Sequence, residues 1–408
     1  MPSKFGWIDF AEEDRQKMLD VVSLFREQDT RDELGIGTIR DAFADHFFPG
    51  TSTIQTRARY MLIVPWVYLE LERKKTPSSE VANKARKMET RIIGAILESG
   101  ETQGVIGQDA RDDLQRLPSN IYWAGLASWG IRCFSGSQAE YHRYLDSYYR
   151  QEQPEKHEAS AETNPNQAKG NWHDGIPKPP GDLYEKTVLS LSVQEAEFLQ
   201  ERILIKHSES LLAKLILESS HSDVEFPWEH PIVGKLAPSL QGELAHSRCF
   251  SDAIHGASML YNLLLARAYK QREEWIADYE KRMEEWSKSI GQRFDELSKW
   301  HGSLREFWDL KFIRETNIPS RTRDFVNSWL NLLFSSKDTM AVVSGKPAQS
   351  LIRNREISLK GKRARLDNQR ALEQWQGASG ASQIDYRWGN ASVMVQDIIE
   401  GLKGTGAK

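Results

Sequence analysis

Cysteine is nearly absent from this chain, which limits the kinds of site that it can build. Its 408 residues include two cysteines, Cys133 and Cys249, which are far apart in the sequence. Two isolated thiols exclude a disulfide framework and a cysteine-rich zinc site. The opening segment MPSKFGWIDFAEEDR also carries acidic residues where a signal peptide needs an apolar core. We therefore expect a cytoplasmic protein.

Long apolar runs and a strong net charge are also missing. The densest apolar run, residues 60–71, contains Pro65 and is followed by charged residues, whereas a membrane-spanning helix needs about 20 apolar residues. The net charge is −4, so the chain as a whole neither attracts nor repels nucleic acid strongly. These absences predict a protein without membrane contact, in which any binding of DNA or RNA depends on a local basic patch.

The motifs of common enzyme classes are missing as well. The sequence has no GxxxxGKS/T phosphate loop, no HExxH zinc motif, no GxSxG nucleophile turn, no paired CxxC and no HxK of the phospholipase-D type. We therefore expect that this chain alone is not an enzyme. We also expect no catalytic residue and no cofactor.

The sequence does contain a succession of amphipathic helical patterns, which predicts a mainly α fold. Helix start signals occur at Asp9 with Glu12 and at Ser192 with Glu195. Residues 153–182 are rich in proline, glycine and asparagine and nearly free of aliphatic side chains, so we expect a flexible linker or long loop there. This linker divides the chain into a multi-helical N-terminal domain, residues 1–152, and a helical C-terminal domain, residues 183–408.

The clearest periodicity lies between Trp275 and Phe312, where apolar residues recur at steps of three or four. This repeat is close to the natural winding of an α-helix, and it predicts a long helix or helical hairpin with bends at Gly291 and Gly302. Tryptophan is abundant in the stripe and anchors both cores and interfaces, so a docking face for a partner protein is one interpretation. The side chains that would carry this face are Trp275, Trp286 and Trp308.

A second pattern, LGIGTIRDAFADHFFPGTSTIQTRARY at residues 34–60, places two helical segments on either side of a turn at Pro49 and Gly50. This layout is typical of a helix-turn-helix, in which the start of the second helix contacts phosphates and base edges. A corner in a helical scaffold is the alternative interpretation, because helix pairs joined by tight turns are common. The candidate contact residues are Gln55, Arg57 and Arg59.

A related pattern occurs at residues 122–145, where a Gly/Ser turn separates two helical segments and the side chains of Gln138, His142 and Arg143 are expected to face outward. Two short segments, residues 341–344 and 383–388, are candidate strands that would form small hairpins or wings. The expected fold class is therefore mainly α, with helix-turn-helix or winged-helix elements in the N-terminal domain and a long helix or hairpin in the C-terminal domain.

Positive charge gathers between Lys346 and Arg370. This segment has eight basic against two acidic residues, a local charge of +6 in a chain whose net charge is −4. Lysines and arginines that neutralise phosphates release counterions, so the segment is typical of a salt-sensitive contact with DNA or RNA. A solvated helix face or a contact for an acidic partner is the alternative interpretation. The residues that we expect at a nucleic-acid contact are Arg353, Arg355, Lys360, Lys362, Arg363 and Arg365.

Five histidines and one cysteine stand within one stretch of the chain: His207, His221, His230, His246, Cys249 and His255. Residues of these types can supply metal ligands, which would make the chain a cryptic metal-dependent nuclease. No carboxylate stands at a fixed helical offset from them, and scattered surface or helix-end histidines are the simpler interpretation. We therefore predict no metal site.

The run LGIGTIRDAFADHFFPGTSTIQTRARYMLIVPW at residues 34–66 resembles the signature of a bacterial protein family of unknown function. The opening FGWIDFAEEDR and the late DYRW at residues 385–388 are similar to that family as well, so the resemblance covers most of the chain. Proteins of this family look like companions of helicases and phospholipase-D-like nucleases in bacterial anti-phage defence clusters. The resemblance implies such an accessory role and supplies no catalytic residues.

These features together predict an accessory protein of a bacterial anti-phage defence system. It would bind DNA, bridge a helicase or phospholipase-D-like nuclease partner to DNA, or do both. A protein-interaction scaffold without nucleic-acid binding is the first alternative. A cryptic metal-dependent nuclease is the second.

Overall fold

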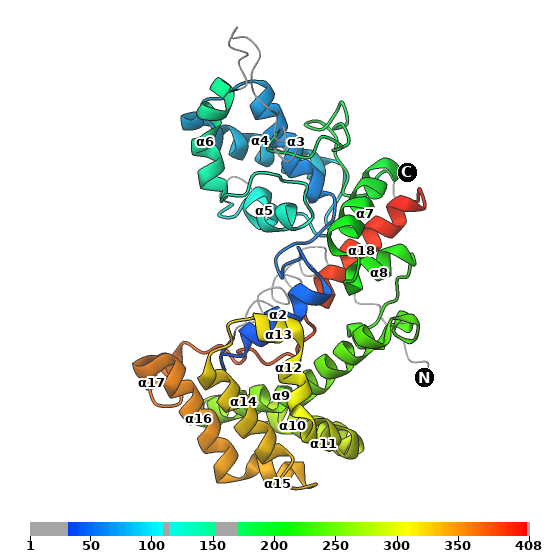
Figure 1. The fold of residues 1–408 in the computed structure, drawn as a ribbon. Coiled ribbons are helices and arrows are strands. Elements are labelled where there is room, and N and C mark those ends of the chain that lie inside the picture. Colours follow the sequence, from blue (N-terminus) through cyan, green and yellow to red (C-terminus); the bar gives the residue numbers. More distant parts are fainter. Residues whose placement is uncertain (1–31, 109–113, 152–169, 406–408) are drawn as a thin grey trace, which may run out of the picture. The chain divides into compact units, whose positions relative to one another are not determined.

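The computed structural model describes residues 32–108, 114–151 and 170–405 (Figure 1). These residues form 17 α-helices and three short 3₁₀ helices, with no strand among them, so the prediction of a mainly α fold is confirmed. The helix predicted to start at Asp9 lies outside the described residues. No helix within the described ranges combines the length and the apolar character that crossing a membrane requires.

The described residues group into two compact units, each made of more than one stretch of chain. Unit 1 contains residues 32–43 and 241–384, and unit 2 contains the described part of residues 44–240 together with residues 385–405. None of the changes from one unit to the other falls in residues 153–182. The linker predicted there stays a prediction, because residues 152–169 lie outside the described part.

Two helices begin in one unit and end in the other: α2 (Gly37–Phe47) and α9 (Pro238–Tyr269). The other helices of unit 2 are α3 (Tyr60–Arg73), α4 (Ser78–Glu98), α5 (Pro118–Ser128), α6 (Gln138–Gln151), α7 (Val193–His207), α8 (Leu211–Leu217), η2 (Pro227–Glu229), η3 (Pro231–Lys235) and α18 (Trp388–Leu402). Those of unit 1 are α10 (Glu273–Gln292), α11 (Phe294–Gly302), α12 (Leu304–Asp309), α13 (Lys311–Glu315), α14 (Ser320–Leu333), α15 (Thr339–Ser344), α16 (Lys346–Lys360), η4 (Gly361–Arg363) and α17 (Gln369–Glu373).

Helix α3 forms the core of one half of unit 2. Every residue from Tyr60 to Tyr68 is buried, which explains why its sequence YMLIVPWVY shows no polar face. A helix that is apolar on all sides needs neighbours on several sides. Helices α4 and α5 pack against α3, and α6 packs against α4.

The other half of unit 2 is built from α7, α8 and α18. Helix α18 packs against both α7 and α8. Gly401 permits the close approach of α18 to α7, because a Cβ at this position would lie 2.7 Å from the Cβ of Ala196. The capping box predicted from Ser192 and Glu195 is present at the start of α7, since the Ser192 side chain accepts a hydrogen bond from the backbone N–H of Glu195.

The described end of the predicted linker belongs to unit 2 and packs against α3. The indole N–H groups of Trp172 and Trp66 are both satisfied there. Trp172 donates to a carboxylate oxygen of Glu72 at 3.2 Å, and Trp66 donates to the backbone oxygen of Pro177 at 2.7 Å. A segment that is rich in proline and glycine is therefore held here by aromatic anchors instead of by aliphatic burial.

Helix α9 forms the centre of unit 1. Gly256 on this helix lies directly under the indole of Trp286, and a Cβ at Gly256 would come within 2.2 Å of that ring. The indole N–H of Trp329 donates to the backbone oxygen of Ala253 at 2.9 Å. Two helices, α10 and α14, therefore anchor a tryptophan each on α9. Along the outer elements, α15 contacts α10, α14 and α16.

The stripe from Trp275 to Phe312 forms a series of helices and not one continuous rod. Breaks follow Gly291 and Gly302, where α10 and α11 end, so the bends predicted at these glycines are confirmed. Lys270, which has a positive φ of 60°, lies between α9 and α10 and interrupts the helix there too. The expected strands are wrong. Residues 341–344 belong to α15. Residues 383–387 form an irregular segment that ends in a turn before α18, which begins at Trp388, so no wing is present among the described residues.

Candidate nucleic-acid interface

The predicted basic segment forms α16, η4 and α17, and half of its expected contact residues point into unit 1. Arg355 has an exposed fraction of 5%. Its guanidinium donates to the backbone oxygens of Leu34, Gly35 and Arg321 at 2.8 to 3.1 Å. These bonds replace water around the buried cation, and burial lowers the pKa of its guanidinium. Arg355 therefore holds residues 34–35 to α16 and cannot contact phosphate.

Lys360 and Arg365 are neutralised by buried carboxylates. Both cations pair with Glu33, Arg365 at 3.0 Å, and Lys360 also pairs with Glu356 at 3.0 Å. Glu356 is fully buried and accepts further hydrogen bonds from the Tyr261 hydroxyl and from backbone N–H groups. Burial by itself raises the pKa of Glu356, but these hydrogen bonds outweigh it and the pKa is lowered. The ion cluster is thus part of the unit 1 interior.

Of the five other basic residues, Lys346 is exposed at the start of α16, and the remaining four gather at the corner where α16, η4 and α17 meet. Lys362 and Arg363 are exposed on η4, and Arg370 is exposed on α17. None of these three side chains has an ion-pair partner in the described part of the chain. The side chain of Asn368 donates to the backbone oxygen of Lys362 at 2.7 Å, which ties the start of α17 to η4.

Arg353 completes this surface, which we name the η4 corner: Arg353, Lys362, Arg363 and Arg370. The Arg353 guanidinium is about half exposed and bonds to the backbone oxygen of Leu366 and to the Asp367 carboxylate. Asp367, between η4 and α17, and Glu373, on α17, are the exposed acids beside them, so four basic residues stand against two acidic ones. The corner with these two acids has a local charge of +2, whereas residues 346–370, a range that does not include Glu373, carry +6.

The expected helix-turn-helix at residues 34–60 is wrong in its second helix. Residues 48–59 are not helical, and α3 begins at Tyr60, after the predicted contact residues. Gln55 is 1% exposed. Its amide donates to the backbone oxygen of Gly50 and accepts from the backbone N–H of Ser52. Its side chain therefore closes the turn from within and is unavailable to a base edge.

Arg57 and Arg59 are also used within unit 2. The Arg57 guanidinium pairs with Asp397 of α18 at 2.9 Å, and burial raises the pKa of that carboxyl even though the neighbouring arginine opposes the shift. Arg59 pairs with Glu195 of α7 at 2.8 Å, with both side chains under 10% exposed. These two ion pairs fasten the segment before α3 to the α7–α18 half of the unit. The segment is a corner in a helical scaffold, as the alternative interpretation held.

The second helix-turn-helix pattern, residues 122–145, is likewise turned inward. Gln138 donates to the Tyr68 hydroxyl at 2.6 Å and to the Ser119 hydroxyl at 2.9 Å. His142 Nε2 is 3.0 Å from the same tyrosine hydroxyl. The side chains of Gln138 and His142, expected to face outward, therefore belong to a polar network between α3, α5 and α6. Arg143 is exposed.

Of the three tryptophans expected to form a docking face, Trp286 and Trp308 are buried in unit 1 and Trp275 is half-buried. Trp286 is 7% exposed, and its indole N–H donates to the backbone oxygen of Asp252. Trp308 donates to the Asn327 side chain. Trp275 packs edge-on against Trp375 at a ring-centroid distance of 5.1 Å. Trp286 and Trp308 are therefore covered by the chain itself, whereas Trp275 is covered only in part.

The histidines and the cysteine considered as metal ligands have other partners or lie apart. Three of the six belong to unit 2 and three to unit 1. His246 accepts from the Trp300 indole N–H, and His255 Nε2 lies 3.0 Å from the backbone oxygen of Ala381. His207 Nε2 lies 2.9 Å from the backbone oxygen of Ser128. Across the described ranges, no group of three or more His, Cys, Asp or Glu side chains is placed to hold a metal ion.

Sequence reasoning missed the acids that neutralise the basic segment. Glu33 lies more than 300 residues before its partners, and nothing in its local sequence connects it to them. Glu356 and Lys360 stand four residues apart, which is the spacing of an ion pair on a helix. This one pair of the cluster could therefore be predicted from the sequence. The η4 corner is what remains for contact with a polyanion once these pairs are formed. Its long cationic side chains suit phosphates and carry no fixed geometry for reading bases.

Comparison with known proteins gives a family and no function. No curated protein and no solved structure matches this chain. One family model, described as a family of unknown function, matches residues 2–401, nearly the whole sequence. The chain therefore belongs to that family, DUF6361.

Proposed function

We propose that this chain binds nucleic acid through the η4 corner, by phosphate contacts and without reading base sequence. The observation that carries the proposal is the group of three exposed cations, Lys362, Arg363 and Arg370, for which the described residues supply no carboxylate partner. Arg353 stands beside them and is shared with Asp367. Arginine and lysine side chains of this kind neutralise phosphates and release counterions from the duplex.

The expected strength of this contact follows from the number of cations. Four phosphate contacts give a slope of about −3 to −4 in a plot of log affinity against log salt concentration for duplex DNA. Contacts of this number correspond to non-specific binding, with dissociation constants of roughly 10⁻⁴ to 10⁻⁶ M at physiological salt. Binding of this affinity is too weak to locate a specific site in a genome. It suits a protein that acts next to another DNA-bound protein.

The role that fits this grip is that of an accessory protein in a bacterial anti-phage defence system. The resemblance described above implies helicase and phospholipase-D-like nuclease companions. In such an assembly the chain adds phosphate contacts to those of its partner, and linked binding sites gain affinity through their high effective concentration. The scaffold without nucleic-acid binding remains the alternative function, and a surface that would serve it is described in the next subsection.

Fluorescence anisotropy with a short labelled duplex, over a series of salt concentrations, tests the nucleic-acid proposal. The variant carries Lys362→Glu, Arg363→Glu and Arg370→Glu together. Its matched control carries Lys87→Glu, Lys178→Glu and Lys235→Glu, three exposed lysines of unit 2 that change the net charge equally. We expect the first variant to lose at least about tenfold in affinity at low salt and the control to lose much less. Equal losses in the two variants, or no binding by the wild-type chain, would overturn the proposal.

A further inference from the structure

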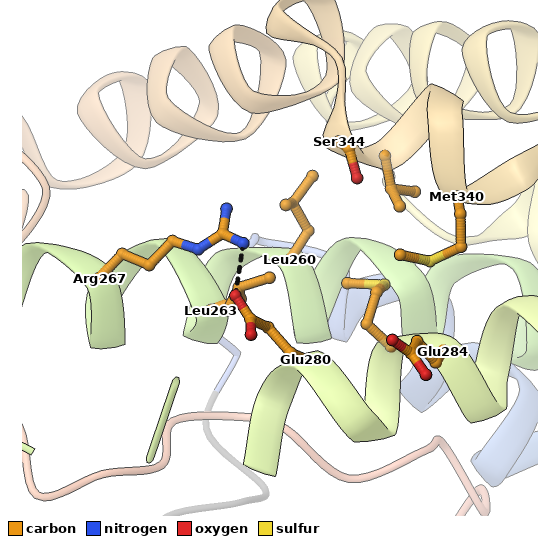
Figure 2. A pocket seen from close by; sticks show the side chains of 9 residues that line it. Leu260, Leu263, Arg267, Glu280, Glu284, Met340 and Ser344 are labelled. Atoms are coloured by element: carbon orange, nitrogen blue, oxygen red, sulfur yellow. Dashed lines mark hydrogen bonds and ion pairs between the residues drawn. The ribbon is translucent and has the colours of Figure 1, made fainter. Parts of the chain in front are cut away.

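Helices α9, α10 and α15 enclose a small pocket on the surface of unit 1, with a volume of about 150 Å³ (Figure 2). Its position differs from that of the η4 corner, and no sequence motif marks its residues. The residues that line it are Leu260, Leu263 and Arg267 of α9, Glu280, Met283 and Glu284 of α10, and Met340, Val343 and Ser344 of α15.

The inner wall of the pocket is apolar. Leu260, Met283 and Val343 are each 1% exposed, so they belong to the core as well as to the pocket. Met340, which also lines the pocket, is half-buried. Methionine side chains are flexible and polarisable, and they adapt to inserted groups of different shape. The wall therefore suits one apolar group without dictating its exact outline.

The volume limits what can enter. Pockets for drug-sized molecules and cofactors occupy about 300 to 1,000 Å³, well above the 150 Å³ found here. An apolar cavity of about 150 Å³ can hold one benzene molecule, which is comparable in size to one large apolar side chain. A single leucine, methionine or phenylalanine side chain is the group of matching size.

The rim of the pocket is acidic. At one side the Arg267 guanidinium pairs with Glu280 at 2.8 Å, and the two side chains are 45% and 48% exposed (Figure 2). Glu284 is exposed on the same helix and has no ion-pair partner among the residues that the structure describes. Helix α10 as a whole carries six acidic against three basic side chains, a local charge of −3. A basic group next to the inserted side chain would therefore be attracted, and a polyanion would be repelled.

We propose that this pocket receives one apolar side chain from a basic, amphipathic helical segment of a partner protein. The anchor side chain enters between Met283 and Met340, and a lysine or arginine one helical turn away pairs with Glu284. Residues at i and i+4 lie on the same face of a helix, so one segment can present both groups at once. A buried apolar core inside a polar rim is the usual arrangement of a protein–protein interface. This proposal does not depend on the nucleic-acid function.

Methyl NMR of the full chain tests the proposal directly. The chain has eight methionines, and Met283→Leu and Met340→Leu variants assign the two pocket signals. The probe is an alanine-based helical peptide of about 15 residues with one central leucine and a lysine four residues to either side. We expect it to shift the methyl signals of Met283 and Met340 and to leave the other methionine signals in place.

Two control peptides separate the two parts of the recognition. In one, alanine replaces the central leucine, and in the other, glutamate replaces both lysines. We expect each to bind at least about tenfold more weakly than the first peptide. Equal binding by either control would overturn the corresponding part of the proposal. No shift at Met283 and Met340 with the first peptide would overturn all of it.

Charge reversal at the rim gives the matched pair of protein variants. Glu284→Lys changes a residue that lines the pocket, whereas Glu285→Lys changes its exposed neighbour, which pairs with Lys281 outside the pocket. Both are solvent-exposed positions, so both variants are expected to fold. We expect Glu284→Lys to weaken the lysine peptide about tenfold or more and to strengthen the glutamate peptide, with little change for Glu285→Lys. Pocket signals that shift with protein concentration alone, or with duplex DNA, would show a different occupant and overturn the proposal.

Discussion

A carboxylate oxygen of Glu89 accepts a hydrogen bond from the backbone N–H of Ser119 at 2.8 Å, so a side chain of α4 caps the first turn of α5. Glu89 is 1% exposed, and its second carboxylate oxygen has no hydrogen-bond partner among the described residues. The capping bond and the start of a helix favour a negative charge, whereas burial opposes it. Burial is the larger effect, and it raises the pKa of Glu89 to about 7.

The first prediction concerns the pH dependence of stability in unit 2. The folded pKa of Glu89, about 7, lies above its ordinary value of 4.5, so the folded state binds more protons between these two values. The free energy of unfolding therefore falls as the pH rises from about 4.5 to about 7, by on the order of 3 kcal/mol from this group. Glu89→Gln keeps an acceptor for Ser119 and removes the titration.

Urea unfolding of wild type and Glu89→Gln over this pH range measures that contribution as a difference, in which the other titrating groups cancel. The charged or titratable groups facing Glu89 are Arg86, Tyr60 and Tyr68. Burial raises the pKa values of both tyrosines, far above the range, and an arginine stays charged throughout it. We expect the variant to gain stability relative to wild type as the pH rises. A difference that stays constant with pH would contradict the assigned role of Glu89.

The second prediction compares two carboxylates that face the basic segment. Glu356→Ala leaves Lys360, the Tyr261 hydroxyl and two backbone N–H groups without their buried acceptor, and we expect a loss of about 3 kcal/mol or more. Asp367→Ala removes an exposed partner of Arg353, and we expect a loss below about 1 kcal/mol. Urea unfolding near neutral pH checks both variants. Equal losses would mean that the Glu356 cluster is not a buried network.

The Glu356 cluster also marks the limit of what local sequence could predict. The amphipathic periods predicted helices correctly over most of the described chain, and Gly291 and Gly302 were correctly placed at the ends of α10 and α11, because helix formation depends mainly on near neighbours. The net positive charge of residues 346–370 can also be counted directly from the sequence. Whether a given arginine faces water depends on distant residues, such as Glu33 for Arg365, and no local pattern reports such a partner.

The burial of Trp286 in the tryptophan stripe could not be predicted from local sequence for the same reason. A residue such as Trp286 suits a core and an interface alike. Trp286 is buried because Gly256 on α9 has no side chain and so leaves room for the Trp286 ring. The candidate pocket was invisible to sequence reasoning because its lining comes from three helices, none of which has an unusual composition at those positions.

The third prediction uses two glycines of α18 as a matched pair. A Cβ added at Gly401 would lie 2.7 Å from the Cβ of Ala196 and 2.9 Å from that of Leu191, both attached to backbone that cannot move independently. Overpacking of this kind costs about 1 to 3 kcal/mol, and we expect Gly401→Ala to destabilise unit 2 by that amount.

At Gly389, near the start of the same helix, the nearest atom to an added Cβ is an Asp385 carboxylate oxygen at 3.4 Å. Alanine favours a helix over glycine by up to about 1 kcal/mol, so Gly389→Ala is expected to be neutral or stabilising. Thermal or urea unfolding of both variants distinguishes the two positions. A stabilising effect of Gly401→Ala would mean that α18 and α7 pack less closely than described.

The last prediction concerns the salt dependence of nucleic-acid binding by single residues. Each phosphate contact contributes about −0.9 to the slope of log affinity against log salt concentration for duplex DNA. Lys362→Gln, at an exposed cation of the η4 corner, should therefore reduce the steepness of this slope by about 1, whereas Lys235→Gln, at an exposed lysine of unit 2, should leave the slope unchanged.

Arg355→Gln is the comparison with a buried arginine of the same segment, which holds the fold together and does not contact DNA. The guanidinium of Arg355 donates to three backbone oxygens, so we expect the substitution to lower the free energy of unfolding. We expect the protein that remains folded to bind DNA with the same slope of log affinity against log salt concentration as wild type. An unchanged slope for Lys362→Gln together with a reduced slope for Arg355→Gln would place the phosphate contacts outside the η4 corner.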